Sequence, residues 1–217
     1  MPQPYVGKER PVYGHFALLS RPLLAAHIGA IATLSSTVDE QWGMILATML
    51  GASAEIGVEI YLALTGATSQ GAVLNTVATQ RLDAAAREHL KGLIKRHRSA
   101  ATQRNRIVHG RWGILPSETD RLVLFERGWS PRATAALDGF LGRLDATTDP
   151  DAVPFVWPDA KPACYTARDF ERVEQDLMDV SRELSDFRAM LLRKFRPLWL
   201  DEPDRTEAST TGMRPQE

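Results

Sequence analysis

Hydrophobic side chains recur at intervals of three and four residues over much of the chain, which predicts a mostly helical protein. The first long pattern covers residues 24–49 and indicates one amphipathic helix. Thr37 and Glu40 have the spacing of a capping box, so a second helix could begin there instead. Because the apolar spacing continues unchanged past Thr37, we expect a single helix.

Three further helices are expected before residue 110. An apolar segment from about residue 52 predicts a helix that ends near Gly66, and a short helix fits residues 70–79. The next pattern, over residues 82–108, predicts a long helix that stops at Gly110.

The inward face of the helix over residues 82–108 is apolar at its start but includes His97 and Arg104 further on. Polar groups on a face that points into a core need hydrogen-bond partners. We therefore expect both side chains to be paired.

The pattern changes after Gly113. Residues 114–115 and 122–125 are apolar and flank a turn-forming segment, which predicts a β-hairpin. A short helix is expected over residues 130–144. Four prolines then make residues 149–163 an irregular connection.

A last long helix is predicted to begin at Thr166, where Asp169 completes a variant of the capping box. Its apolar residues keep the same spacing over residues 170–191 and indicate lengthwise packing on another helix. Pro197 is expected to end this helix. Residues 201–217 contain five acids and little apolar surface, so a mobile tail is expected there.

These elements predict one helical domain over residues 21–197, between an N-terminal extension over residues 1–20 and an acidic tail over residues 198–217. The hairpin and the irregular connection form an insertion over residues 113–164. The predicted fold class is thus a mostly α helical bundle with a small β-hairpin insertion.

The composition is that of an ordinary globular protein, with 44% hydrophobic and 24% charged residues. The single cysteine, Cys164, cannot form an intrachain disulfide, which fits a reducing cytoplasm. The first 21 residues lack the apolar core of a signal peptide, and the apolar stretch over residues 23–34 is too short to span a bilayer. We expect a soluble, cytoplasmic protein with no membrane partner.

The overall charge of −1 conceals a strongly basic segment. Residues 81–112 contain nine basic and two acidic residues, a local charge of +7, so the remainder of the chain carries −8. A concentrated basic helix is typical of a surface that binds a polyanion such as RNA, although its arginines could instead pair with acids elsewhere in the molecule. The candidate RNA-binding residues are Lys91, Lys95, Arg96, Arg98, Arg106 and Arg111.

Motifs for several enzyme classes are absent, namely the phosphate-binding loop, the dinucleotide fingerprint, the zinc-protease motif and the nucleophile elbow. The chemically distinctive residues are Arg104, Asn105 and His109, at the end of the basic helix. Cleaving RNA without a metal requires proton transfers, which suit histidine, and fixed positive charge on the phosphate, which suits arginine. These three are the candidate catalytic residues, and they call for no cofactor and no metal.

The segment from Arg104 to Trp112 also resembles the HEPN superfamily of all-α proteins, many of which are metal-independent endoribonucleases. It has the R-N-x-x-x-H-G-x-W form of some bacterial members. The resemblance covers roughly residues 24–112 and 165–195. It implies a HEPN-like helical bundle that cleaves RNA by attack of the 2′-hydroxyl at a dimer-interface site.

A homodimer is also the simplest way to complete such a site, because one histidine cannot be acid and base at the same time. Two copies of His109 would supply both groups, and Asn105 would orient the histidine or a phosphate oxygen. The resemblance further suggests a defence or toxin–antitoxin setting, with an antitoxin or regulatory protein as a partner besides RNA.

Three residues are expected to support the site. Asp39 matches an acidic position in the first helix of the family, and either Asp39 or Glu40 could pair with Arg104. His97 could line the same cleft, although a buried core-edge histidine is the commoner role. Trp112 could stack on a base but is more typical of a packing residue.

The same residues also permit a protein that does not cleave RNA. Arg104 would then anchor the bundle in an ion pair, with Asn105 and His109 capping backbone carbonyls. Many HEPN proteins are inactive, so the sequence leaves open an endoribonuclease and an inactive helical dimer that acts as a binding or regulatory module. A third alternative is an adaptor that uses the apolar seam over residues 170–191 as its interface.

Overall fold

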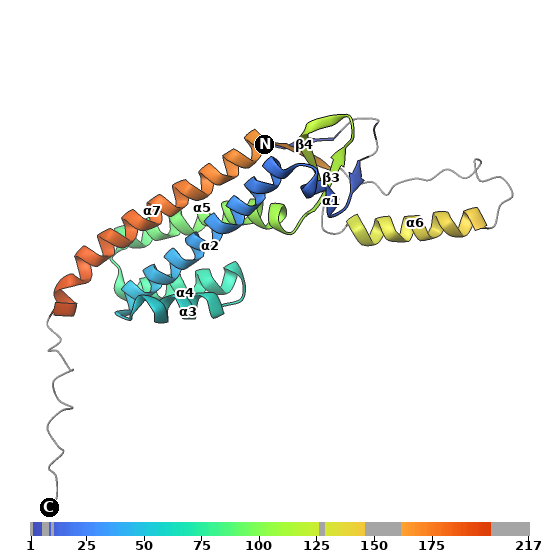
Figure 1. Cartoon of the computed structure of the whole chain (residues 1–217). Coiled ribbons are helices and arrows are strands. Elements are labelled where there is room, and N and C mark those ends of the chain that lie inside the picture. The colour runs from blue at the N-terminus through green and yellow to red at the C-terminus, as the bar shows by residue number, and fades with distance from the viewer. Residues whose placement is uncertain (1, 6–8, 10, 126–128, 146–161, 201–217) are drawn as a thin grey trace, which may run out of the picture. The chain divides into compact units, whose positions relative to one another are not determined.

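The computed structural model describes residues 2–5, 9, 11–125, 129–145 and 162–200. Helices predominate and are accompanied by five short strands (Figure 1). The prediction of a mostly α protein is therefore confirmed. The helices are α1 (Phe16–Leu19), α2 (Pro22–Leu50), α3 (Ala54–Ala63), α4 (Gly66–Arg81), α5 (Ala84–Val108), α6 (Trp129–Asp145) and α7 (Ala167–Leu200). The strands are β1 (Gln3–Pro4), β2 (Val12–Tyr13), β3 (Arg111–Leu115), β4 (Glu118–Phe125) and β5 (Ala163–Thr166).

The chain divides into two compact units. The first unit comprises Met1–Ser36 and Lys95–Asp179, and the second comprises Thr37–Ile94 and Val180–Glu217. All five strands belong to the first unit, whereas α3 and α4 belong to the second.

The five strands of the first unit form one antiparallel sheet in the order β1-β5-β4-β3-β2. The predicted hairpin is confirmed as β3 and β4, which pair around a turn at Pro116 and Ser117. The other three strands were not expected. They add residues 3–4 and 12–13 of the N-terminal segment, together with residues 163–166, to the two edges of the hairpin.

An aromatic cluster forms the centre of the first unit. Trp112 of β3, Tyr165 of β5 and Phe170 of α7 are all buried. Their ring centroids lie 5.2 Å apart for Trp112 and Tyr165 and 5.5 Å apart for Trp112 and Phe170. Edge-to-face and tilted contacts at this distance are favourable beyond the area that they bury. The cluster thus joins the sheet to the first turns of α7.

The second unit has its own core, built around the fully buried Trp42, Tyr61 and Phe187. Helices α2 and α3 pack backbone against backbone, because a Cβ atom at Gly43 would lie 2.5 Å from the Val58 Cα atom. A larger residue at this position would therefore push α2 and α3 apart.

The helix predictions hold for most of the chain. Helix α2 is continuous through Thr37, so the alternative of a new helix at that residue is wrong. It ends before Gly51, whose φ of +74° is the left-handed conformation that glycine adopts at helix ends. Helix α4 extends well beyond the predicted short helix over residues 70–79. Helix α4 has few hydrophobic residues and many small ones. The hydrophobic pattern therefore predicted only its central part.

The last helix begins as predicted, with Asp169 accepting a hydrogen bond from the Thr166 backbone N–H (3.1 Å). The expectation that Pro197 ends this helix is wrong, since α7 continues to Leu200. A proline lacks one N–H donor, but a helix can continue past the single missing bond. The predicted connection over residues 149–163 falls mostly outside the described residues, and the tail over residues 201–217 falls wholly outside them.

In the described part of the chain, no single helix combines the length and the apolar character needed to cross a membrane. Helices α2 and α3 have this length and apolar character only when they are taken together, and they are bent by 119° at the break between them.

A close contact at Gly110 gives the first prediction. A Cβ atom there would collide with the Leu124 side chain of β4 and lie 2.6 Å from the Arg106 carbonyl oxygen. We expect Gly110→Ala to lower the free energy of unfolding by about 1–3 kcal/mol, measured by urea denaturation. Gly92→Ala is the matched control, because a Cβ atom on this α5 glycine would meet no atom within 4 Å. It should raise stability by about 1 kcal/mol through helix propensity. A neutral Gly110→Ala would contradict the close contact.

Candidate functional site

Helix α5 ends at Val108, immediately after the residues that the sequence singled out. The His109 backbone N–H still donates to the Asn105 carbonyl (3.1 Å), so His109 continues the helical hydrogen bonding by one residue. The Trp112 indole N–H donates to the Ile107 carbonyl (3.1 Å) in a buried environment. This bond satisfies one of the carbonyls that a helix end leaves without a partner. The end of α5 is therefore fixed to the start of β3.

Two of the three motif side chains, those of Arg104 and Asn105, are in contact at this helix end. Arg104 is half-buried, and its Nη1 donates a 2.7 Å hydrogen bond to the Asn105 side-chain oxygen. The side chains of Asn105 and His109 are exposed. The structure therefore brings Arg104 and Asn105 into contact and leaves His109 accessible at the same helix end. The buried Nε of Arg104 has no hydrogen-bond partner among the described atoms.

His97 differs sharply from His109. Only 8% of its surface is exposed, as expected for a core histidine. Burial, followed by the charges of Arg104 and Arg98, lowers the pKa of His97 to about 4. The imidazole is therefore uncharged at neutral pH, and its place on the inward face is compatible with the nearby cations only in that form.

The basic residues predicted to bind RNA are all exposed. Five of them belong to the first unit: Lys95, Arg96, Arg98, Arg106 and Arg111. Lys91 belongs to the second unit, where its ammonium lies 3.3 Å from the Glu88 carboxylate. An exposed pair of this kind contributes little to stability and leaves the lysine available to a ligand.

The predicted acidic partners of Arg104, Asp39 and Glu40, belong to the second unit, so this pairing stays a prediction. Within that unit Asp39 influences a buried tyrosine. Burial, and then the Asp39 carboxylate, raise the pKa of Tyr61 far above its ordinary value. The Tyr61 hydroxyl therefore remains protonated at all physiological pH values.

Trp112 and the single cysteine, Cys164, have structural roles. Trp112 is buried among aromatic rings, which confirms packing over base stacking. Cys164 lies in β5 in a hydrophobic cluster, and burial raises the pKa of its thiol. A thiol that is harder to ionise is a poor nucleophile.

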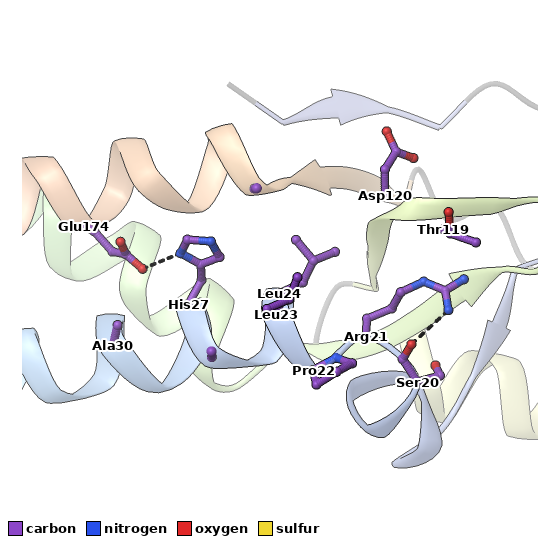
Figure 2. Close-up of a pocket in the computed structure, with 12 residues that line it drawn as sticks. Ser20, Arg21, Pro22, Leu23, Leu24, His27, Ala30, Thr119, Asp120 and Glu174 are labelled. Carbon is purple, nitrogen blue, oxygen red and sulfur yellow. Dashed lines mark hydrogen bonds and ion pairs between the residues drawn. The ribbon is translucent and has the colours of Figure 1, made fainter.

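The sequence missed a second group of polar residues in the first unit, at a pocket of about 910 Å³ (Figure 2). His27 of α2 lies there against Glu174 of α7, with 2.8 Å between Nδ1 and the carboxylate. The imidazole also stacks on the Phe170 ring, with an interplanar angle of 6° and 5.9 Å between centroids. The one signal in the sequence was that His27 interrupts an apolar stretch. Its partner is 147 positions away, so no local pattern could pair the two.

No family model, curated protein or solved structure matches this chain. Among the described residues there is also no group of three or more histidine, cysteine or acidic side chains placed to hold a metal ion.

The buried, uncharged His97 predicts a specific dependence of stability on pH. Its folded-state pKa of about 4 lies below the ordinary value of 6.5, so the unfolded chain takes up the proton first as the pH falls. The contribution of the uncharged His97 to the stability of the folded state is complete above pH 6.5 and is lost as the pH falls toward 4. We expect it to account for roughly 2.5 kcal/mol of unfolding free energy between pH 7 and pH 4.5.

Urea denaturation of the wild type and of His97→Gln at both pH values measures this difference. The variant should lose less stability on acidification than the wild type, by that amount. His15→Gln is the control, because His15 is exposed, and it should behave like the wild type. Equal losses in the wild type and in His97→Gln would show that His97 does not titrate in this way.

Proposed function

We propose that the protein is a metal-independent endoribonuclease of HEPN type, with its site at the end of α5. The observation that carries the proposal is the hydrogen bond between Arg104 and Asn105 beside the exposed His109. The R-N-x-x-x-H-G-x-W motif thus has its cation, its amide and its histidine on one accessible helix end. The exposed basic residues of the same helix favour a polyanionic substrate.

Each motif residue has a distinct task in this reaction. Arg104 keeps further N–H donors beyond the one used by Asn105 and can give them to phosphate oxygens. His109 exchanges a proton with the 2′-hydroxyl or with the leaving 5′-oxygen. The Asn105 side-chain oxygen is already held by Arg104, so its amide N–H₂ group is directed by that bond and can orient the substrate.

Completion of the site requires a second copy of the chain. RNA cleavage through the 2′-hydroxyl needs one group that accepts a proton and another that donates one. His97 is poorly suited to be the second group because it is buried and its pKa is lowered to about 4. A two-fold homodimer that places two His109 side chains at one phosphate supplies both.

The first test is cleavage of a single-stranded RNA in excess EDTA. We expect the wild type to release fragments with 2′,3′-cyclic phosphate ends, detected by mass spectrometry. His109→Ala should lower the rate by about a hundredfold to ten-thousandfold, the usual contribution of a general acid–base group. His15→Ala should leave the rate unchanged, because His15 is an exposed histidine outside the motif.

Sedimentation of the same samples gives the oligomeric state, and a dimer is expected. Equal cleavage by the wild type and by His109→Ala would assign the activity to a contaminant. A complete lack of cleavage by the wild type on structured and unstructured RNA would overturn the proposal.

The second candidate function is an inactive helical dimer that binds a protein or RNA partner. The half-buried side chain of Arg104 favours it, since an arginine that packs partly inside the fold can contribute to its stability. Two opposing predictions for Arg104→Ala separate the candidates. If Arg104 is a structural anchor, the variant should lose about 3–5 kcal/mol of unfolding free energy. If Arg104 acts on the phosphate, RNA cleavage should be lost while stability changes by less than about 1.5 kcal/mol.

Urea denaturation and the EDTA-resistant cleavage assay provide the two measurements. Arg111→Ala is the control for stability, because Arg111 is exposed and should change the unfolding free energy by less than about 0.5 kcal/mol.

A further inference from the structure

The pocket that contains His27 and Glu174 shares no residue with the Arg104, Asn105 and His109 group. Its walls come from three places in the first unit: the segment around the start of α2, the start of β4 and the first turns of α7 (Figure 2). The apolar part of the lining comes from Leu23, Leu24, Ala26 and Ala30 of α2, with Ala167 of α7. A mostly apolar hollow with a few polar groups is the usual form of a small-molecule site.

The charged side chains of the pocket differ in whether an oppositely charged side chain lies beside them. Glu174 pairs with His27 (2.8 Å), and Asp120 lies 3.5 Å from the Arg121 guanidinium. Arg21 pairs with no acidic side chain among the described residues. Its guanidinium donates only to backbone carbonyls, those of Ser20 (3.0 Å) and Glu118 (3.2 Å). The pocket therefore contains one cation whose charge is not neutralised.

The Arg21 guanidinium also has N–H groups that make no hydrogen bond to the described residues. A guanidinium has five N–H groups, and the two bonds to carbonyls occupy two of them. The Nε atom is buried without a hydrogen-bond partner. Arginine is the side chain best suited to a carboxylate, because its planar donors match the two carboxylate oxygens.

The two polar ends of the pocket lie apart, with Leu23 and Leu24 between them (Figure 2). Arg21 immediately precedes α2 and His27 lies six positions further on, which corresponds to about 9 Å at the helical rise of 1.5 Å per residue. His27 uses Nδ1 for Glu174, and its Nε2 has no hydrogen-bond partner among the described residues. A ligand held at Arg21 would thus run along apolar side chains toward a second, weaker polar group.

From this arrangement we infer that the pocket binds a small amphipathic carboxylate, with its anionic group on Arg21 and its aliphatic chain over Leu23, Leu24 and Ala30. The inference is independent of ribonuclease activity, because the two sites use different residues.

Isothermal titration calorimetry of the full chain with decanoate, below its micelle concentration, tests the inference. The matched probe is 1-decanol, which has the same chain and no charge. We expect decanoate to bind about tenfold or more tightly than decanol, the difference that a charge-assisted bidentate hydrogen bond supplies. Arg21→Gln should abolish this preference, and Arg143→Gln, at an exposed arginine of α6, should retain it.

A second pair of variants tests the pocket without touching a charge. Ala30→Phe should reduce binding of both probes by filling the pocket, whereas Ser36→Phe, at an exposed position of α2 outside the lining, should not. Unfolding curves of each variant exclude loss of the fold as the cause.

Three outcomes would overturn the inference. They are equal affinity for decanoate and decanol, an unchanged preference in Arg21→Gln, or binding to vesicles of anionic lipid with none to free decanoate. The last outcome would assign Arg21 to a lipid surface instead.

Discussion

The burial of Trp112 is the constraint on which the first unit and its candidate site depend. This indole packs against both Tyr165 of β5 and Phe170 of α7, and its N–H needs an acceptor because the side chain is buried. The Ile107 carbonyl, in the last turn of α5, provides it. One side chain therefore ties the sheet, the start of α7 and the end of α5 together. Because His109 lies between Ile107 and Trp112 in the chain, the same hydrogen bond restricts the position of the His109 backbone.

Sequence periodicity was sufficient for the long helices, and for a physical reason. Each has an apolar side that must be buried, so Trp42 and Ile45 in α2 or Phe170 and Leu177 in α7 repeat with the period of the helix. The cap at Thr166 was also visible, because its partner Asp169 is only three residues away. The candidate site was predictable to the same extent: Arg104 and Asn105 are neighbours in the sequence, and the structure joins them directly.

Features that depend on distant residues were not predictable. Strands β1 and β2 have two residues each, too few for any alternation, and they exist only because β5 and β3 offer them free edges. The His27–Glu174 pair has the same origin, since α2 and α7 bring together residues that belong to opposite ends of the chain. Gly110 was interpreted as a helix stop. Its additional role, leaving space for Leu124 of β4, could not be inferred before the sheet was known.

Burial also determines which histidine can take part in proton transfer at the end of α5. His97 and Arg104 are two turns apart on the inward side, where low solvation and neighbouring cations both oppose a charged imidazole. His109 lies one residue past the helix and remains in contact with solvent. Because His97 is buried and uncharged at neutral pH, it is a poorer proton-transfer group than His109. In the proposed chemistry, a homodimer that places two His109 side chains at one phosphate would supply the second proton-transfer group.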